Sequence, residues 1–465
     1  MVKTKKEVDM LSGSITKGLL KITLPIMTMN VIICLFNIID MTVLKMYDTD
    51  GGFSVGSVGA CGTLISLITG LMIGISSGAN AVIARHIGSG DRDRVKKSIG
   101  TSLMVAVLGG LVLTVIGVSF AEIFLVWMNC PELLLDGAVL YFRLYFIGGP
   151  IMMLSTFTSA ILSSSGDTRR PMVYSIIGGA AKVGLNLAFV GLFKMGITGV
   201  ALSTIISWTL TSALTGFAIF KSGGTVKVTI KDLRISKQEL SEILFIGVPT
   251  GLQQALYSIA NVIITAAVNS FGPEATTGIS IANQFDGILY QISMATSIAV
   301  MPYVSQNIGN RNIKRATQSV LKGTLITIAF GAFFGALSAI FSAELSSIMS
   351  DNPEVIAYSQ QKMIIISSTY FICGLNGILI SAMNGMKKPI VATVTTFLYM
   401  CVIRFIWVYG VFPLYRNLTF LYLIWPIGWI LSIITILCFY FPAVKHYKRE
   451  FAKDNEPSRA EAVEV

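Results

Sequence analysis

The chain has 465 residues, of which 53% are hydrophobic and only 13% are charged, and its formal net charge is +11. Soluble domains carry about 25% charged residues, so this composition excludes a soluble protein and indicates a polytopic membrane protein. A nucleic-acid-binding role is excluded as well, because the basic residues lie in short clusters between apolar runs, which is the pattern of cytoplasmic loops.

Apolar runs long enough to cross a bilayer follow one another along the chain, and each crossing takes roughly 20 residues. In chain order they are Leu19–Leu44, Val58–Ala84, Ile99–Val126, Ala138–Leu162, Met172–Leu192, Ile197–Phe220, Ile243–Phe271, Thr276–Val304, Leu321–Ile348, Met363–Met383, Ile390–Phe412 and Phe420–Val444. We therefore predict an all-α polytopic membrane protein with twelve transmembrane helices.

The loops between these runs alternate in charge. With the N-terminus placed in the cytoplasm, only Lys45, Lys194 and Arg416 fall in outside loops, and most other basic residues fall in inside loops. This positive-inside pattern predicts that both termini are cytoplasmic and that the crossing number is even. We expect a multi-pass protein of the inner (plasma) membrane.

The two halves of the chain resemble each other. The segment "IARHIGSGDRDRVKKSIGTSL" after the second run resembles "VSQNIGNRNIKRATQSVLKGTL" after the eighth, and "SGDTRRP" resembles "NGMKKP". Six predicted helices separate the copies, so the repeat is parallel and predicts two six-helix lobes. The expected domains are an N-terminal lobe at 1–221, a cytoplasmic linker at 222–242, a C-terminal lobe at 243–447 and a polar tail at 448–465.

The loop "GSGDRDRVKK" has three interpretations. It fits the loop motif of the major facilitator superfamily only loosely, since Val95 stands where a glycine or basic residue is wanted. A solvated basic loop that sets topology is a second interpretation. The partial echo at Gly309 favours the third, a turn specific to the repeat.

Several polar residues lie within the first apolar run. Asn30, Asn37 and Asp40 share one helical face, which should point to the lobe interior because polar groups cannot face lipid cheaply. An ionisable residue inside the membrane suggests function. A carboxylate held permanently by a neighbour is the alternative.

As a whole, the sequence resembles the MATE (multidrug and toxic compound extrusion) transporters, in their DinF-like branch. The resemblance rests on "ARHIGSGDRDRVKKS", on "SSSGDTRRPM…AAKVGLNLAFVGLFKMGITGVALSTIISW" and on "GVPTGLQQALYSIANVIITAAVNSFGPEATTGISIANQ". It implies two lobes around a central cleft and export of organic cations or other amphiphiles in exchange for protons or sodium. It also implies that Asp40 is a protonatable group and that Thr204 contributes a hydroxyl from the sixth helix.

The fifth helix departs from this family. Many members carry an Asn-x-x-x-Asp pair where this chain has Lys182 and Asn186. Lys182 lies about 11 residues, or roughly 16 Å of helical rise, past Pro171 and hence near mid-membrane. An ammonium at that depth should be neutral or paired, and Asp40 is the candidate partner. The open question is whether Lys182 competes with a proton or substrate for Asp40 or forms a fixed ion pair.

The second lobe offers Asp286 on the eighth helix and Arg404 on the eleventh, which could pair with each other. Sodium-coupled relatives resemble one another in carrying acids on helices 7 and 10, where this chain has Gln253, Gln254 and Asn376. Because a hard cation prefers carboxylate oxygens, sodium is less favoured at that position.

The sequence thus predicts a secondary active antiporter that works by rocking of two lobes. A lipid-linked or polysaccharide flippase of the same superfamily is the alternative, since Lys182 and Arg404 could meet an anionic headgroup. We expect no catalytic or metal site, no cofactor beyond the coupling ion (H+ or Na+), no nucleic-acid partner, a small-molecule substrate and a monomer within the lipid bilayer.

Overall fold

A computed structural model of the chain describes residues 7–47, 53–128, 130–221 and 224–455. The first half contains α1 (Ile15–Met46), α2 (Phe53–Ser89), α3 (Arg92–Ser119), α4 (Ala121–Trp127), α5 (Glu132–Ile147), α6 (Gly149–Ser164), α7 (Arg169–Asn186), the π-helix η1 (Leu187–Leu192) and α8 (Gly196–Lys221). The second half contains α9 (Lys237–Asn269), α10 (Pro273–Gly309), α11 (Ile313–Ile340), α12 (Ser342–Ser347), α13 (Pro353–Ser367), α14 (Tyr370–Gly385), α15 (Pro389–Thr396), the π-helices η3 (Phe397–Val402) and η4 (Trp407–Val411), α16 (Ile403–Ile406), α17 (Leu418–Tyr422) and α18 (Ile424–Asn455). The short 3-10 helices η2 (Ile230–Asp232) and η5 (Phe412–Leu414) complete the described elements.

The twelve predicted crossings are recovered in this all-helical fold. In the described parts of the chain, ten helices are long and apolar enough to span a membrane, and two bent pairs bring the number up to twelve. The fourth crossing is α5 with α6, bent by 51°, and the tenth is α13 with α14, bent by 46°. Pro150 at the start of α6 accounts for the first bend, because proline lacks a backbone N–H to continue the preceding helix.

The internal repeat is visible in the backbone. Gly90 and Gly166 have positive φ angles of 78° and 91°, and their counterparts in the other half, Arg311 and Lys387, have 53° and 57°. Gly90 and Arg311 are separated by the same number of residues as Gly166 and Lys387. Residues other than glycine adopt this left-handed conformation only at an energetic cost, so its recurrence at equivalent turns shows that the halves share one architecture.

The helix that follows the first of these turns is also capped alike in both halves. Asp91 accepts a hydrogen bond from the backbone N–H of Arg94 at 3.0 Å, and Asn312 accepts one from Arg315 at 3.0 Å. Both are N-cap interactions, which stabilise helix starts by about 1 kcal/mol. The loop "GSGDRDRVKK" is therefore a turn of the repeat, as its echo at Gly309 indicated.

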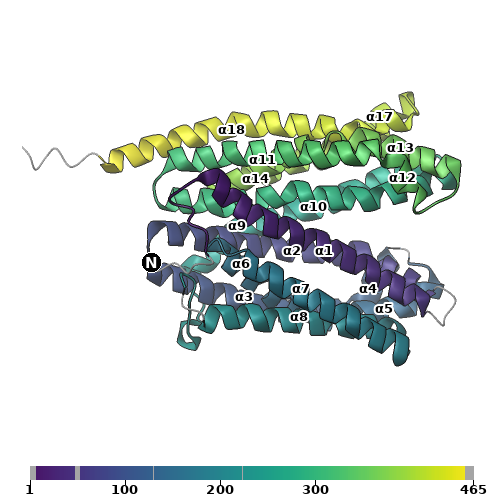
Figure 1. The fold of residues 1–465 in the computed structure, drawn as a ribbon, viewed down its shortest axis with the longest axis horizontal. Coiled ribbons are helices and arrows are strands. Elements are labelled where there is room, and N and C mark those ends of the chain that lie inside the picture. Colours follow the sequence, from purple (N-terminus) through teal and green to yellow (C-terminus); the bar gives the residue numbers. More distant parts are fainter. Residues whose placement is uncertain (1–6, 48–52, 129, 222–223, 456–465) are drawn as a thin grey trace, which may run out of the picture.

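We call α1–α8 the first lobe and α9–α18 the second lobe, and Figure 1 shows them as two helical layers lying one above the other. The end of the molecule that carries the turns at Gly90, Gly166, Arg311 and Lys387 is called the basic end. It lies at the left of Figure 1, where α18 ends and where the described chain starts.

The predicted linker connects the lobes at the basic end. Its residues 222 and 223, like residues 456–465 of the predicted tail and 1–6 of the first lobe, lie outside the described residues. From Gly224 the linker passes through η2, where the backbone N–H and the hydroxyl of Thr229 bond to Asp232 and lower the pKa of that carboxyl. α9 begins at Lys237, so its first residues belong to the range predicted as linker.

The two lobes pack closely near the basic end through glycines of α2 and α9. A methyl group added to Gly74 would lie 2.0 Å from the backbone nitrogen of Gly251, and one added to Gly78 would lie 2.6 Å from that of Gly247. Nearer the opposite end of α2, Gly59 and Gly62 meet no described atom within 4 Å. The lobes therefore approach each other backbone to backbone in one half of the molecule and not along its whole length.

The same end carries a contact that reflects the repeat. A methyl group on Gly88 would meet the carbonyl oxygen of Gln306 at 1.9 Å, and one on Gly309 would meet that of Arg85 at 2.1 Å. Gly88 and Gly309 occupy equivalent places in the two halves, and so do Arg85 and Gln306. This reciprocal packing is the arrangement that a pseudo-twofold axis between the lobes produces.

A charged cluster, which we call the basic-end cluster, joins the lobes beside these glycines. Its acids are Glu239 and Glu242 of α9, and its first-lobe bases are Arg85, His86 and Arg94. Glu239 is 1% exposed and accepts from Arg94 at 3.0 Å and from the Ser98 hydroxyl at 2.6 Å, and its carboxylate lies 2.9 Å from the His86 ring. Glu242 is bound by Arg85 at 2.9 Å, by Arg94 at 3.2 Å and by Lys387 of the second lobe at 3.1 Å.

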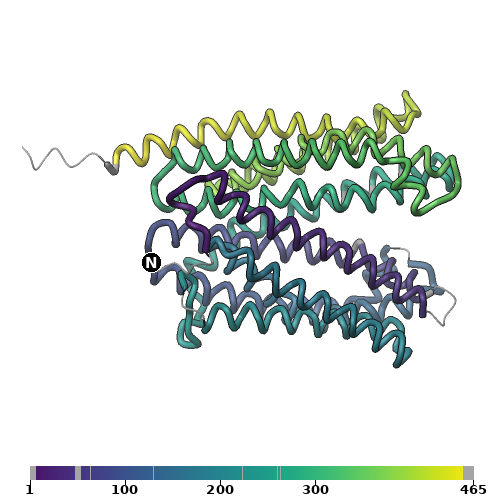
Figure 2. Tube along the Cα trace, viewed as in Figure 1, coloured from purple at the N-terminus to yellow at the C-terminus, as the bar shows by residue number. Residues whose placement is uncertain are grey.

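Helix α1 contacts both lobes. Leu19, Ile22 and Ile26 in its first half belong to a buried core with Tyr303 and Val304 of α10. Its later half, which contains Asp40, packs against α7 of the first lobe, and Figure 2 shows the helix running obliquely between the two layers. The first crossing is thus shared between the lobes, a feature that the hydrophobic pattern alone does not indicate.

The glycine packing yields a matched test. We expect Gly74→Val to lower the thermal unfolding midpoint in detergent, because a side chain forced against the Gly251 backbone costs about 1–3 kcal/mol. Gly62→Val places the same β-branched residue in the same helix without a close neighbour and should change the midpoint much less. Equal midpoints for the two variants would contradict the close approach of the lobes.

Candidate functional site

The first lobe contains an ion pair inside the membrane-spanning region. Asp40 of α1 is 4% exposed, and its Oδ2 atom is bound by the Nζ atom of Lys182. The side-chain amide of Asn186 donates to Oδ1 of the same carboxylate at 2.5 Å. Lys182 and Asn186 are four residues apart on α7, so they project from one face of that helix toward α1. The structure brings these three predicted residues together.

Local features of α1 and α7 set this geometry. The ring of Phe36 lies against Gly179, where an added methyl group would be 2.0 Å from a ring carbon, so α1 and α7 approach closely one turn before the ion pair. Directly after Asn186 the helix continues as the π-helix η1, and such widened turns occur often at functional sites. Asn186 is fully buried, and the oxygen of its side-chain amide has no hydrogen-bond partner in the described residues.

Within the described residues, no hydrogen bond or ion pair joins the other predicted residues of this lobe to Asp40, Lys182 or Asn186. Asn37 is exposed, while Asn30 donates to Gln291 of the second lobe at 3.2 Å. Thr204 is buried and bonds backward to the carbonyl of Val200 at 2.9 Å, as helical threonines commonly do. The centre formed by Asp40, Lys182 and Asn186 is therefore more compact than the polar stripe predicted along the first helix.

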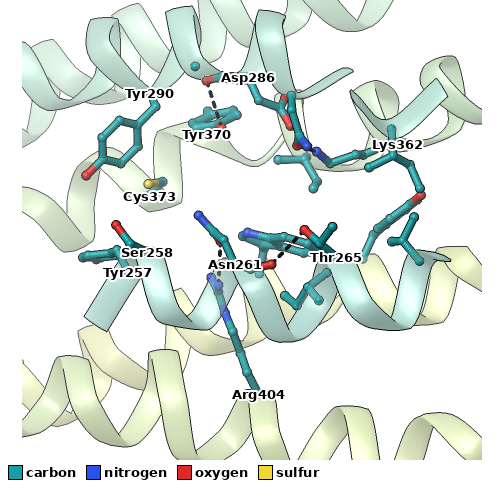
Figure 3. A pocket seen from close by; sticks show the side chains of 18 of the residues that line it. Tyr257, Ser258, Asn261, Thr265, Asp286, Tyr290, Lys362, Tyr370, Cys373 and Arg404 are labelled. Carbon is teal, nitrogen blue, oxygen red and sulfur yellow. Dashed lines mark hydrogen bonds and ion pairs between the residues drawn. The ribbon is translucent and has the colours of Figure 1, made fainter. Parts of the chain in front are cut away.

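The second lobe contains a matching centre. Asp286 of α10 lies 2.9 Å from the Nζ atom of Lys362 on α13, and Lys362 also donates to the side-chain oxygen of Asn283. Lys362 is 2% exposed and Asp286 is 8% exposed. Figure 3 shows the lysine and the aspartate pointing toward each other across the cavity wall. Each lobe thus holds one aspartate, one lysine and one asparagine, which are joined through the aspartate in the first lobe and through the lysine in the second.

The suggested partner of Asp286 needs correction. Arg404 donates to the side-chain oxygen of Asn261 at 3.0 Å, and within the described residues no ion pair joins it to Asp286. The signal that could have identified Lys362 as the partner is its position directly before the apolar run Met363–Met383, since Asp286 is an opposite charge within another apolar run.

A cavity of about 390 Å³ lies within the second lobe, beside Asp286 and Lys362. This volume lies within the usual range for small-molecule sites, about 300–1,000 Å³. Aromatic rings form much of its wall: Tyr257, Tyr290, Tyr370, Tyr422, Trp425 and Trp429. Among its described lining residues the charged ones are Asp286, Lys362 and Arg404, so the cavity carries one positive charge in excess.

The positions where sodium-coupled relatives carry acids hold amides here. Gln253 donates to the Thr393 hydroxyl at 2.9 Å, and Asn376 accepts from the Ser432 hydroxyl at 2.7 Å. Gln254 lines the cavity. In the part of the chain that the structure describes, no group of three or more His, Cys, Asp or Glu residues is arranged to hold a metal ion.

Comparisons with known proteins agree with this architecture. A family model described as MatE matches residues 25–188 and 249–409. The Probable multidrug resistance protein YoeA of Bacillus subtilis is 28% identical over 336 residues, which cover 71% of this chain and 72% of that protein. The FAD transporter of Shewanella oneidensis is 23% identical, with 82% of this chain and 84% of that protein covered.

Solved structures show the same fold. The outward-facing conformation of a multidrug resistance MATE family transporter has a TM-score of 0.87 and 19% identity, covering 96% of this chain and 100% of that one. The flippase alternative is not favoured by these matches. Because the family model matches most of both halves of the sequence, this chain belongs to the MATE family of multidrug efflux transporters.

Proposed function

We propose that the protein is a secondary active exporter that exchanges amphiphilic small molecules, organic cations among them, for protons or sodium ions. The observation that carries this proposal is the buried aspartate in each lobe, which is paired with a lysine of the same lobe. The names of two relatives, a multidrug resistance protein and an FAD transporter, support a family with chemically diverse cargo.

The packing of the lobes supports alternating access. The lobes meet at the basic end through glycine contacts and the basic-end cluster. We place this end and both termini in the cytoplasm of a plasma-membrane protein, on the positive-inside pattern. Opening toward the cytoplasm would then require the first-lobe bases to leave Glu239 and Glu242. One chain supplies both lobes, so a monomer contains the complete path.

Coupling would centre on Asp40. An ionised carboxylate away from water requires a cation beside it, and Lys182 supplies one that is tethered to the protein. When a proton, a sodium ion or a cationic substrate takes that place, Lys182 can withdraw without leaving Asp40 uncompensated. The amides Gln253 and Asn376 support the proton over sodium, because sodium prefers carboxylate oxygens.

The ion pair leads to a double-mutant prediction. Lys182→Met and Asp40→Asn each leave one buried charge without its partner, which costs about 3–5 kcal/mol in a fixed buried pair. We expect the double variant to lose clearly less stability than the sum of the two single variants, measured as thermal unfolding midpoints in detergent. Additive losses would show that the two side chains do not interact.

Transport by reconstituted protein tests the proposed function directly. In proteoliposomes with an imposed proton or sodium gradient, wild type should move a fluorescent organic cation against its concentration gradient, and Asp40→Asn should lose this coupling. The matched control is Asp136→Asn, which alters an exposed carboxyl of α5 and should transport normally. Gradient-driven uptake by Asp40→Asn equal to that of wild type would remove Asp40 from the mechanism.

The lysine permits a second measurement in the same assay. If Lys182 competes with protons for Asp40, Lys182→Ala should change the pH dependence of transport, whereas a fixed structural role would alter only the amount of folded protein. An unchanged pH profile at reduced protein yield would support the structural role.

A further inference from the structure

The cavity of the second lobe has an unusual charge balance for a site that would take organic cations. Its single described carboxylate, Asp286, is already bound by Lys362 at 2.9 Å. Arg404 adds a second cation to the wall, and no described carboxylate bonds to it. A positively charged ligand would therefore have to displace Lys362 and lie close to Arg404.

At least one hydrogen-bond donor of the Arg404 guanidinium has no partner in the described residues. The side chain is 2% exposed, and it donates to Asn261 at 3.0 Å and to the sulfur of Met400 at 3.5 Å. Its Nε atom is buried and has no hydrogen-bond partner in the described residues. A guanidinium has five N–H donors in a planar fork that matches a carboxylate or phosphate, and a buried donor without a partner is costly.

Aromatic side chains surround this group. The centroid of the Trp425 ring lies 5.1 Å from the guanidinium carbon of Arg404 and 5.9 Å from the Nζ atom of Lys362, so two cations flank one indole. Figure 3 shows Tyr257, Tyr290 and Tyr370 around the same space. Aromatic walls of this kind accept a planar ring by stacking or edge contacts.

We infer that the second-lobe cavity binds an aromatic anion, whose carboxylate or phosphate is held by Arg404 and Lys362 and whose ring packs against Trp425 and the tyrosines. Asn261, which already accepts from Arg404, holds the guanidinium in place at the cavity wall. This inference rests on the proposed export function and names a cargo class for the second lobe.

Asp286 should weaken anion binding in this cavity because it already binds Lys362. Its carboxylate competes with the ligand for Lys362, and one of its oxygens is buried without a hydrogen-bond partner. Removing the charge of Asp286 should release Lys362 and strengthen anion binding. A damaged fold would weaken binding instead, so this change separates the proposed role from misfolding.

Equilibrium dialysis tests the inference with purified full-length protein in phosphatidylcholine nanodiscs and empty nanodiscs as the blank. Four probes share one ring system: 2-naphthoate, 2-naphthyl phosphate, the cation 2-naphthylmethylammonium and the neutral 2-naphthylmethanol. We expect at least one of the two anions to bind about tenfold or more tightly than the cation and the neutral probe, since one charge-assisted hydrogen bond suffices for that ratio.

Anion binding is then measured for three variants. Arg404→Gln should weaken anion binding about tenfold or more, and Asp286→Asn should strengthen it. The matched control is Arg143→Gln, which changes an exposed arginine of the first lobe and should leave binding unchanged. Tighter binding of the cation, equal anion binding by wild type and Arg404→Gln, or no binding of either anion would each overturn the inference.

The outcome is separable from that of the proposed function because dialysis involves no ion gradient. Coupled transport of an organic cation by a protein that binds neither anion would contradict only the anion site. Anion binding that depends on Arg404, in a protein that shows no gradient-driven transport, would contradict only the proposed exporter.

Discussion

A carboxylate that is taken out of water must keep a positive charge beside it, and this requirement organises the membrane-embedded part of the protein. Asp40 meets it with Lys182, and Asp286 meets it with Lys362. Each pair joins two helices that are far apart in the sequence, α1 to α7 and α10 to α13. Because breaking such a pair costs more than most single contacts, the pairs restrain these helices and place the polar centre of each lobe.

The two lobes share one architecture, but the close contacts described between them lie near the basic end. Recurring left-handed turns, equivalent N-caps and reciprocal glycine contacts show the duplication, and the basic-end cluster adds charges that bridge the lobes. The two copies differ at Lys387, which holds a left-handed conformation where the first half has glycine and whose ammonium binds Glu242 at 3.1 Å. The close glycine contacts between the lobes that the described residues show lie in the half of the molecule near the basic end.

Much of this architecture could be predicted from the sequence, because hydropathy reports directly on which segments cross a bilayer and the turn motifs repeat. The meeting of Asp40 and Lys182 also followed from two opposite charges within apolar runs. Three features could not be predicted from the sequence. They are the bends of the fourth and tenth crossings, the sharing of α1 between the lobes and the pairing of Asp286 with Lys362. These depend on how helices distant in the chain pack together, and local patterns carry no information on that.

The unequal charge of the two lobes has an electrical consequence. The first-lobe centre is neutral as an Asp–Lys pair, whereas the second-lobe cavity has one cation more than it has acids. A membrane voltage does work on net charge, about 2.3 kcal/mol per elementary charge for each 100 mV. When the inferred monovalent anion fills the second-lobe cavity, that site becomes neutral, so the voltage would act on the return step, in which this cavity holds no anion, and not on the step that moves the cargo.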